Sequence, residues 1–342
     1  MANPGIGHKT RVTMAKEATY GVAPAAATAC FEIASIELTP VTGVIEDANM
    51  NPTTISRRNL TPIGGLVRGR LRARVGYEGY LELLRGVLSN YVAITVETGV
   101  RDHIFKGAVD ALSYTIDCDE GKALTATKTQ RITGVVFTDL SLTAQAGGGE
   151  GGYLMAEASF LGKANGKLFD VTPMTGGVYA SEYPIPFTQV ALTGGDYWDG
   201  SDQADPSTSR PRNFEMHITQ PYQEDRYFMS SKYPDRPLRN GPLECNFRIM
   251  REFDSKDGAV LSQSATIPDN GLLFQFNHPL IIGVGSTREF EIHAKSIVLG
   301  DVTEPVEGYQ SMIQTIPSRA FYNASDNCSV LIRVRSGEAA LV

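Results

Sequence analysis

The five histidines are the first side chains to consider for catalysis or metal binding: His8, His103, His217, His278 and His293. No two of them are two or four residues apart, the spacing that would place two ligands on one side of a strand or helix. His217 and His293 fall on the polar sides of alternating segments, which favours solvated or interface roles. The histidine pattern therefore predicts no metal site.

Two other segments superficially resemble ligand-binding loops. Residues 5–10 end in Lys-Thr, but His8 stands where a phosphate-binding loop needs glycine, and no strand precedes it. Four aspartates recur at every third position of a later loop: Asp196, Asp199, Asp202 and Asp205. They lack the residue order and the closing glutamate of an EF-hand. No Gly-x-Ser-x-Gly nucleophile motif occurs either, so we predict no catalytic residue, no metal and no cofactor.

The four cysteines are far apart and form no Cys-x-x-Cys pair: Cys30, Cys118, Cys245 and Cys328. We interpret each as a small buried hydrophobic residue and not as part of a disulfide framework. The net charge of −7 argues against attraction of nucleic acid by bulk charge. No signal-peptide core and no run of about 18 apolar residues is present, so neither secretion nor a membrane span is predicted.

Residues 55–88 are the best organised stretch, and they predict a polar turn, a strand and a short helix. The turn carries Arg57 and Arg58. The strand carries an arginine at every second position: Arg68, Arg70, Arg72 and Arg74. Successive side chains of a strand point to opposite faces, so these four arginines, the arginine row, share one face.

A short amphipathic helix is predicted after Gly76 and Gly79. Its apolar residues follow the i, i+3, i+4, i+7 spacing of one buried stripe. The stripe consists of Tyr80, Leu83, Leu84, Val87 and Leu88. We expect Tyr80, Leu84, Val87 and Leu88 to pack this helix onto its domain.

The arginine row is compatible with three roles. It could be a solvated strand face, it could pair with carboxylates of a neighbouring subunit, or it could bind nucleic acid. Interleaved aromatic residues and a net basic domain are missing, which disfavours nucleic acid.

Most of the remaining chain alternates between apolar and polar residues over short segments, which predicts a mainly β fold. The clearest hairpin spans residues 139–162. Its tip is a glycine-rich run: Gly147, Gly148, Gly149, Glu150, Gly151 and Gly152. We predict that this tip makes inter-subunit or inter-ring contacts.

Residues 226–261 repeat the order of elements of residues 55–88, with Arg248-Ile249 in the place of Arg74-Val75. The repeat suggests an N-terminal arm at 1–27, one domain at 28–170 and a degenerate second copy at 171–342, packed side by side. The second strand carries Glu244, Asn246 and Arg248 in place of an arginine row. A contact made once per chain, to a neighbouring subunit or ring, therefore explains the row better than DNA binding.

Three phrases carry a resemblance to siphophage tail tube (major tail) proteins over most of residues 10–165. The first is Lys16-Glu17-Ala18-Thr19-Tyr20-Gly21, and the second is Val67-Arg68-Gly69 followed by a helix with Leu83-Leu84 and Leu88. The third is the hairpin ending Ser-Phe-Leu-Gly-Lys at 159–163. The second half matches only in the order of its elements.

The resemblance implies a mainly β protein whose two domains are β-sandwiches or open barrels, each flanked by a short helix. Such proteins are structural and form hexameric rings that stack into a hollow virion tail tube. Arms and hairpins join the rings, and DNA and the tape measure protein occupy the lumen. With two copies per chain, we expect a trimeric ring with pseudo-sixfold symmetry.

The implied partners are other copies of the chain, the tape measure protein, and the tail terminator and tail tip proteins, after assembly in the bacterial cytoplasm. One alternative is another virion ring: a terminator, a baseplate ring or a contractile-type tube. The other is a carbohydrate-binding β-sandwich that uses Trp198 with Tyr183 and Tyr197.

Overall fold

The computed structural model describes residues 11–46, 60–108, 110–119, 129–147, 152–163, 167–176, 183–194, 211–229, 231, 233–252, 272–294, 296–299, 313–324 and 327–341. These residues are mainly antiparallel β-strand, which confirms the predicted fold class. The predicted helix is present as α1 (Leu81–Leu88). A second helix, expected near residues 253–261, lies outside the described residues.

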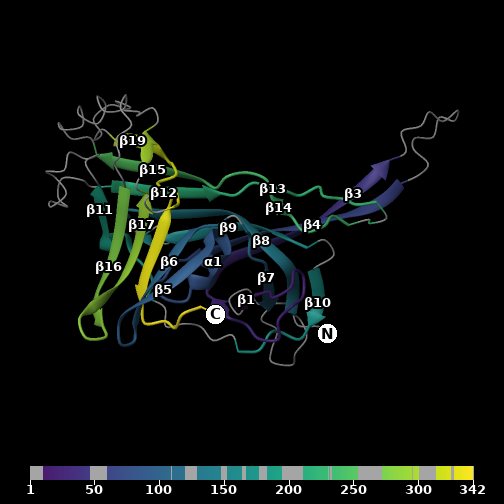
Figure 1. The fold of residues 1–342 in the computed structure, drawn as a ribbon, viewed down its shortest axis with the longest axis horizontal. Coiled ribbons are helices and arrows are strands. Elements are labelled where there is room, and N and C mark those ends of the chain that lie inside the picture. Colours follow the sequence, from purple (N-terminus) through teal and green to yellow (C-terminus); the bar gives the residue numbers. More distant parts are fainter. Residues whose placement is uncertain are drawn as a thin grey trace.

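The described strands include one sheet of twelve, and eight of these form a continuous antiparallel series, here called the long sheet (Figure 1). Their order is β3 (Ile33–Glu46), β4 (Leu60–Arg74), β9 (Met155–Gly162), β8 (Thr129–Gln145), β12 (Pro211–Thr219), β15 (Glu244–Glu252), β19 (Ile313–Ala320) and β18 (Ile297–Leu299). The first four and the last four strands follow the same order along the chain: first, second, fourth, third. Strand β15 therefore has the same place among the last four strands as β4 has among the first four.

The division into two domains remains a prediction, because the sheets run across the expected boundary. Strand β12 of the second half pairs with β8 of the first half over seven consecutive residues, from Asn213↔Gln145 to Thr219↔Asp139. The other half of β8 pairs with β7 (Tyr114–Asp119) and β10 (Lys167–Val171).

Part of the expected N-terminal arm belongs to the core. Residues 11–16 form β1 (Arg11–Lys16), which pairs with β7 and with β2 (Ala29–Phe31). Val12 and Met14 of this strand are buried. Their apolar side chains outweigh the Ala- and Pro-rich composition that suggested an arm, and residues 1–10 lie outside the described part of the chain.

A second sheet of six strands crosses the long sheet and packs against its apolar face (Figure 1). Its order is β5 (Ser89–Glu97), β6 (Val100–Gly107), β20 (Leu331–Ser336), β17 (Ser286–Ala294), β16 (Leu272–Ile282) and β11 (Val190–Gly194). Buried phenylalanines fill the space between the sheets; the ring centroids of Phe214 on β12 and Phe274 on β16 lie 4.0 Å apart. Helix α1 contacts β5, β6 and β8 and closes the side of this core.

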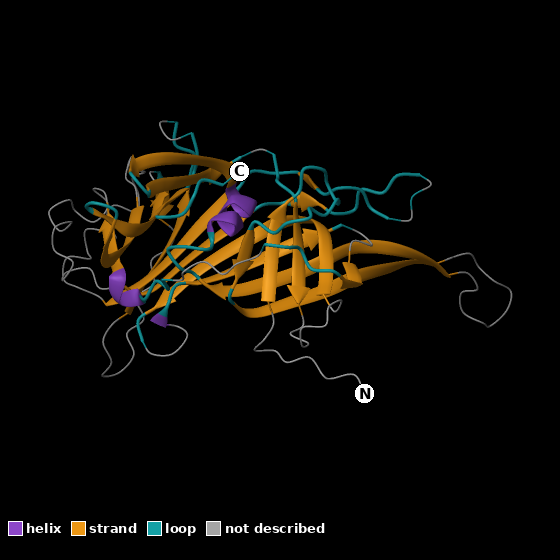
Figure 2. Cartoon of the chain, turned by 90° about the horizontal axis from the view of Figure 1, so that it is seen from below, coloured by secondary structure: helices purple, strands orange, loops and turns teal. Residues whose placement is uncertain are grey.

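Strands β3 and β4 extend beyond the body as a two-stranded ribbon (Figures 1 and 2). Strand β4 pairs with β9 only from Val67 onward, so residues 60–66 pair with β3 alone. The β12–β15 connection, which contains β13 (Tyr222–Gln223) and β14 (Leu238–Arg239), lies against the root of this ribbon. The Tyr227 hydroxyl donates a hydrogen bond to the Gly64 carbonyl at 3.1 Å. An isolated two-stranded ribbon is marginal in water, so this extension is suited to contact with another surface.

Candidate assembly surfaces

The arginine row lies as its spacing predicts, on one exposed face of β4. Arg68, Arg70, Arg72 and Arg74 are exposed, whereas Leu71 and Ala73 between them are buried. Arg57 and Arg58 lie outside the described residues.

Carboxylates of the same chain accompany the arginines across this face of the long sheet. Arg68 pairs with Glu224 at 2.8 Å, and Arg70 pairs with Glu157 on β9. In the second half, Arg319 pairs with Glu244 at 2.9 Å. Exposed pairs of this kind contribute little to stability, but they compensate the positive charge of the face locally.

The glycine-rich tip joins β8 to β9. A Cβ atom on Gly152 would lie 2.7 Å from the Gly147 carbonyl oxygen, so the two ends of the tip approach closely. Gly148, Gly149, Glu150 and Gly151 lie outside the described residues, and the predicted contact role of the tip remains a proposal.

The apolar stripe of α1 is buried: Tyr80, Leu84, Val87 and Leu88 are each 3% exposed or less. A Cβ atom on Gly86 would lie 2.7 Å from the Phe137 ring, so helix and sheet approach closely there. Glu82 is also buried, and it accepts a hydrogen bond from the Tyr114 hydroxyl at 3.2 Å. Desolvation raises the pKa of the Glu82 carboxyl above its usual range.

A buried glutamate organises the turn after β1, and the sequence analysis assigned it no role. One carboxylate oxygen of Glu17 accepts hydrogen bonds from the Thr115 hydroxyl at 2.7 Å and the Gly134 N–H at 2.8 Å. The other accepts from the Gly21 N–H at 2.7 Å. Both glycines have positive φ, +73° at Gly21 and +64° at Gly134, which other residues adopt at a cost. Glu17 therefore joins the Gly21 turn to β7 and β8.

Tyr20 connects two of the phrases quoted from the sequence. The Lys163 ammonium lies 5.9 Å from the centroid of its ring, and the Arg236 guanidinium lies 5.5 Å from it. Burial raises the pKa of the Tyr20 hydroxyl. Tyr20 thus packs the first of these phrases against Lys163, which ends the third phrase, and against the β12–β15 connection.

Comparison with known families identifies the kind of protein that uses this architecture. The family described as phage tail tube protein matches residues 7–317. The chain belongs to the phage tail tube protein family. No curated protein sequence matches it. Tail tube proteins are structural components of the virion tail that assemble with themselves into a tube.

The second sheet of this tail tube protein carries a dense charge network on its outer face. It links two arginines of β20 to residues of β6 and β17: Arg333, Arg335, Asp102, Glu289, Glu291 and His293. Arg335 Nε lies 2.7 Å from Asp102, and His293 Nε2 lies 2.8 Å from Glu291. Although burial opposes ionisation, hydrogen bonds from His293 and Arg333 lower the pKa of Glu291. The alternation in the sequence placed His293 on a polar side, but the pairing of these residues requires the strand order β6-β20-β17.

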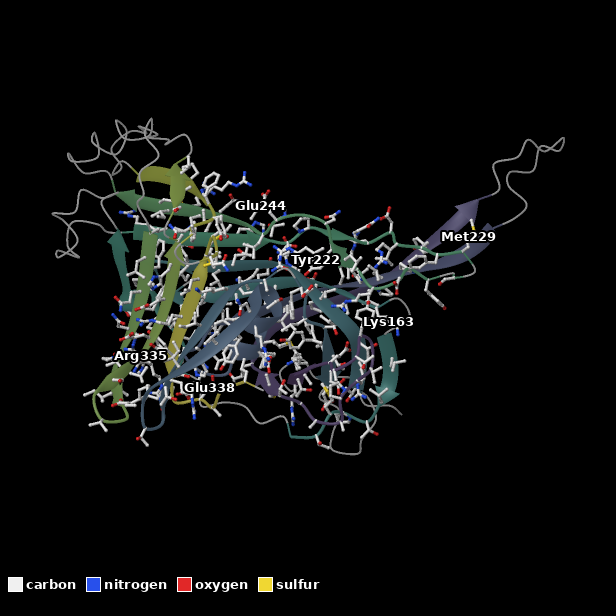
Figure 3. All side chains as sticks on the ribbon, in the orientation of Figure 1. Lys163, Tyr222, Met229, Glu244, Arg335 and Glu338 are labelled. Carbon is white, nitrogen blue, oxygen red and sulfur yellow. The ribbon has the colours of Figure 1, made fainter. Side chains whose placement is uncertain are left out.

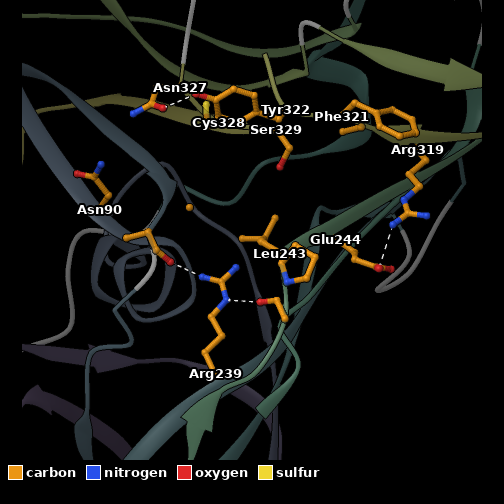
Figure 4. A pocket seen from close by; sticks show the side chains of 15 residues that line it. Asn90, Arg239, Leu243, Glu244, Arg319, Phe321, Tyr322, Asn327, Cys328 and Ser329 are labelled. Carbon is orange, nitrogen blue, oxygen red and sulfur yellow. Dashed lines mark hydrogen bonds and ion pairs between the residues drawn. The ribbon is translucent and has the colours of Figure 1, made fainter. Parts of the chain in front are cut away.

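A pocket of about 750 Å³ lies between the end of β6 and the strands β15 and β19 (Figure 4). Arg239 donates hydrogen bonds to the Ala108 carbonyl and, at 3.1 Å, to the Gly241 carbonyl. Glu244 is paired with Arg319, and the Cys328 thiol is buried.

Of the remaining cysteines, histidines and aromatic residues, some pack inside the structure or against a neighbouring side chain, and others lie outside the described residues. All four cysteines are buried and none forms a disulfide, as predicted. His103 is buried, and its Nδ1 lies 2.9 Å from the Tyr91 hydroxyl; desolvation lowers the pKa of its imidazole to about 4. The Arg288 guanidinium stacks 3.8 Å from the Tyr183 ring centroid. Trp198, Tyr197 and the aspartate-rich loop lie outside the described residues.

Within the described residues, no group of three His, Cys, Asp or Glu side chains could hold a metal ion. No described helix is both long enough and apolar enough to cross a membrane.

Proposed function

We propose that this tail tube protein forms the stacked rings of a siphophage tail tube, whose lumen conducts DNA and houses the tape measure protein. The long sheet is the observation that carries this proposal. Within the described residues, it consists of two four-strand units with the same strand order, exposes one charged and polar face, and has edge strands at both ends, β3 and β18. An unpaired edge is a template for another strand, and closure into a barrel removes it.

Strand directions favour closure between identical copies. Every neighbouring pair in the long sheet is antiparallel, so β3 and β18 run in opposite directions. Strand β18 of one copy can therefore pair with β3 of the next in the way that β8 pairs with β12 within the chain. Head-to-tail contacts of this kind close a ring when the rotation permits. Three chains would supply six four-strand units, hence a trimeric ring with pseudo-sixfold symmetry.

The charged face of the long sheet suits a lumen that DNA slides through. Protein binds DNA mainly by neutralising phosphates with Lys and Arg. Here arginines of both halves are paired with carboxylates of the same chain, as in Arg70–Glu157 and Arg319–Glu244. The net charge of −7 adds weak repulsion. The further partners that we propose are the tail terminator and tail tip proteins, with assembly in the bacterial cytoplasm.

Electron microscopy and mass measurement test this function. Purified protein at high concentration should form long straight tubes, and rings released from them should have the mass of three chains. Six chains per ring would exclude the trimer, and a protein that never polymerises would exclude the tube.

The arginine row is proposed as a contact between subunits, together with Arg57, Arg58 and the tip at residues 147–152. It lies one strand away from the β3 edge. Replacing both Arg70 and Arg72 with Glu should prevent tube formation while leaving the monomer folded by circular dichroism. Arg248→Glu is the control, because Arg248 lies on the same face of the long sheet, on β15, and is not part of the arginine row. Normal tubes from the double variant would refute the assignment.

A further inference from the structure

The β16–β17 hairpin ends in an exposed apolar tip, here called the knob. Leu280 is 59% exposed, Ile281 is 65% exposed and Val284 is 89% exposed. The turn between the strands uses Gly283 at φ +66°. Aliphatic side chains clustered at such a tip mark an interaction site when no part of the same chain covers them.

The knob is held in place and does not fold back onto its own sheet. A carboxylate oxygen of Glu97, at the turn of the adjacent β5–β6 hairpin, accepts a hydrogen bond from the Ser286 N–H at 3.2 Å. Val92, Ile94 and Val96 are also exposed, along β5 at the edge of the same sheet. The charged residues of β6, β20 and β17 on this sheet differ from them, since they are paired within the chain. The knob and β5 are thus the part of this sheet that gains most from burial.

A pocket of about 700 Å³ lies at the other end of the molecule. Three exposed apolar side chains line it, from the turn after β1, from β10 and from the β12–β15 connection: Val22, Leu168 and Phe228. Lys163 and Asp235 also line it. Lys163 and strand β10 lie at one end of the body, whereas Arg335 and the β16–β17 tip lie at the opposite end (Figures 1 and 3).

We propose that the knob of one copy of the chain inserts into this pocket of a second copy in the adjacent ring. The two surfaces share apolar character and lie at opposite ends of the same chain. The pocket volume is within the range of about 300–1,000 Å³ that holds compact ligands. Lys163 beside the pocket is complementary in charge to Glu97 beside the knob. The other two charges that line the pocket are paired within the chain, Arg131 with Asp117 at 2.7 Å and Asp235 with Arg226 at 3.6 Å. A contact between different surfaces at opposite ends repeats along an axis without closing, as successive rings of a tube require. This inference rests on the proposed stacked tube.

Charge substitutions test whether the contact is needed. Val284→Asp in the knob and Leu168→Asp in the pocket should each abolish sedimentable tubes and leave single rings. Leu238→Asp is the matched control, because Leu238 on β14 is 48% exposed and belongs to neither surface. It should assemble normally. Tubes formed by either test variant at the wild-type concentration would overturn the proposal, as would equal loss of assembly in the control.

Crosslinking tests whether the two surfaces touch. All four native cysteines are buried, so background reaction is low. In tubes of the Val284→Cys/Leu168→Cys double variant, a short bis-maleimide should produce a ladder of covalent multimers on a denaturing gel. The Val284→Cys/Leu238→Cys variant should remain monomeric there, and tubes of the first variant without a ladder would overturn the contact. A wild-type protein that never stacks would instead overturn the proposed function itself, so the two failures are distinguishable.

Discussion

Glu17 allows the sharpest test of how the N-terminal half of the chain is held together, because one buried carboxylate accepts hydrogen bonds from three donors. Its partners are the Gly21 N–H, the Thr115 hydroxyl and the Gly134 N–H, at 2.7, 2.7 and 2.8 Å. Glu17 is 6% exposed, so water cannot readily replace the carboxylate. We predict that Glu17→Ala unfolds the Gly21 turn and strongly destabilises the monomer.

The size of the effect follows from the donors left without an acceptor. An unsatisfied buried donor costs about 1–3 kcal/mol. Two N–H groups and one hydroxyl lose their acceptor, and the hydroxyl can rotate to another, so the predicted loss is about 3–5 kcal/mol. Glu17→Gln keeps one acceptor oxygen but turns an amide NH₂ toward one donor, so its cost is about 1–3 kcal/mol. Domains are stable by only about 5–15 kcal/mol, so the alanine variant removes a large share of the total.

Urea unfolding of the monomer, followed by circular dichroism, measures these losses as shifts of the midpoint at constant slope. Glu224→Ala is the control, because Glu224 is also a hydrogen-bond acceptor but lies on the exposed face, where its donor is Arg68. Its cost should stay below about 1 kcal/mol. A Glu17→Ala cost no greater than that of Glu224→Ala would refute the assigned role.

Two further predictions concern stability. Burial raises the pKa of Glu338 to about 7 from an ordinary value of 4.5, and its carboxylate accepts from the Gly79 N–H at 3.0 Å. The folded pKa exceeds the unfolded one, so stability falls as the pH rises from about 4.5 to 7. Glu338→Gln should therefore stabilise the monomer by up to roughly 3 kcal/mol at pH 8 and by almost nothing at pH 4. A pH-independent difference in urea midpoint would contradict this. Gly86→Ala adds a Cβ 2.7 Å from the Phe137 ring, and overpacking should cost about 1–3 kcal/mol despite the better helix propensity. Gly285→Ala, where the Cβ meets nothing within 4 Å, is the control; equal urea midpoints would show that the helix can shift freely.

The sequence predicted those strands and helices whose pattern of polar and apolar residues lies within one short segment. The arginine row is a strand because polar and apolar residues alternate, and α1 forms because Tyr80, Leu84, Val87 and Leu88 share one side of a helix. In both cases the apolar residues to be buried can be read from a window of about ten residues, although in α1 every residue except Arg85 is buried and not only the predicted stripe.

The pairing of distant strands could not be predicted in the same way. Strand β20, the last in the chain, lies between β6 of the first half and β17 of the second. Its alternating Arg333 and Arg335 indicate only that one side is polar. The carboxylates that pair with them become visible once the neighbouring strands are known. The role of Glu17 has the same origin, because two of its three donors lie 98 and 117 residues further along the chain.

The repeated long sheet has a consequence for how the proposed ring would come apart. Two kinds of junction join its four-strand units: β8·β12 inside the chain and β18·β3 between chains. The inner junction is paired over seven consecutive residues and is covalently tethered, so its strands remain at high effective concentration after separation. The described part of β18 offers only three residues to a neighbour. Dilution or denaturant should therefore separate β18 from β3, between chains, before it separates β8 from β12. The arginine row, which only one of the two four-strand units carries, then lies beside the edge that opens.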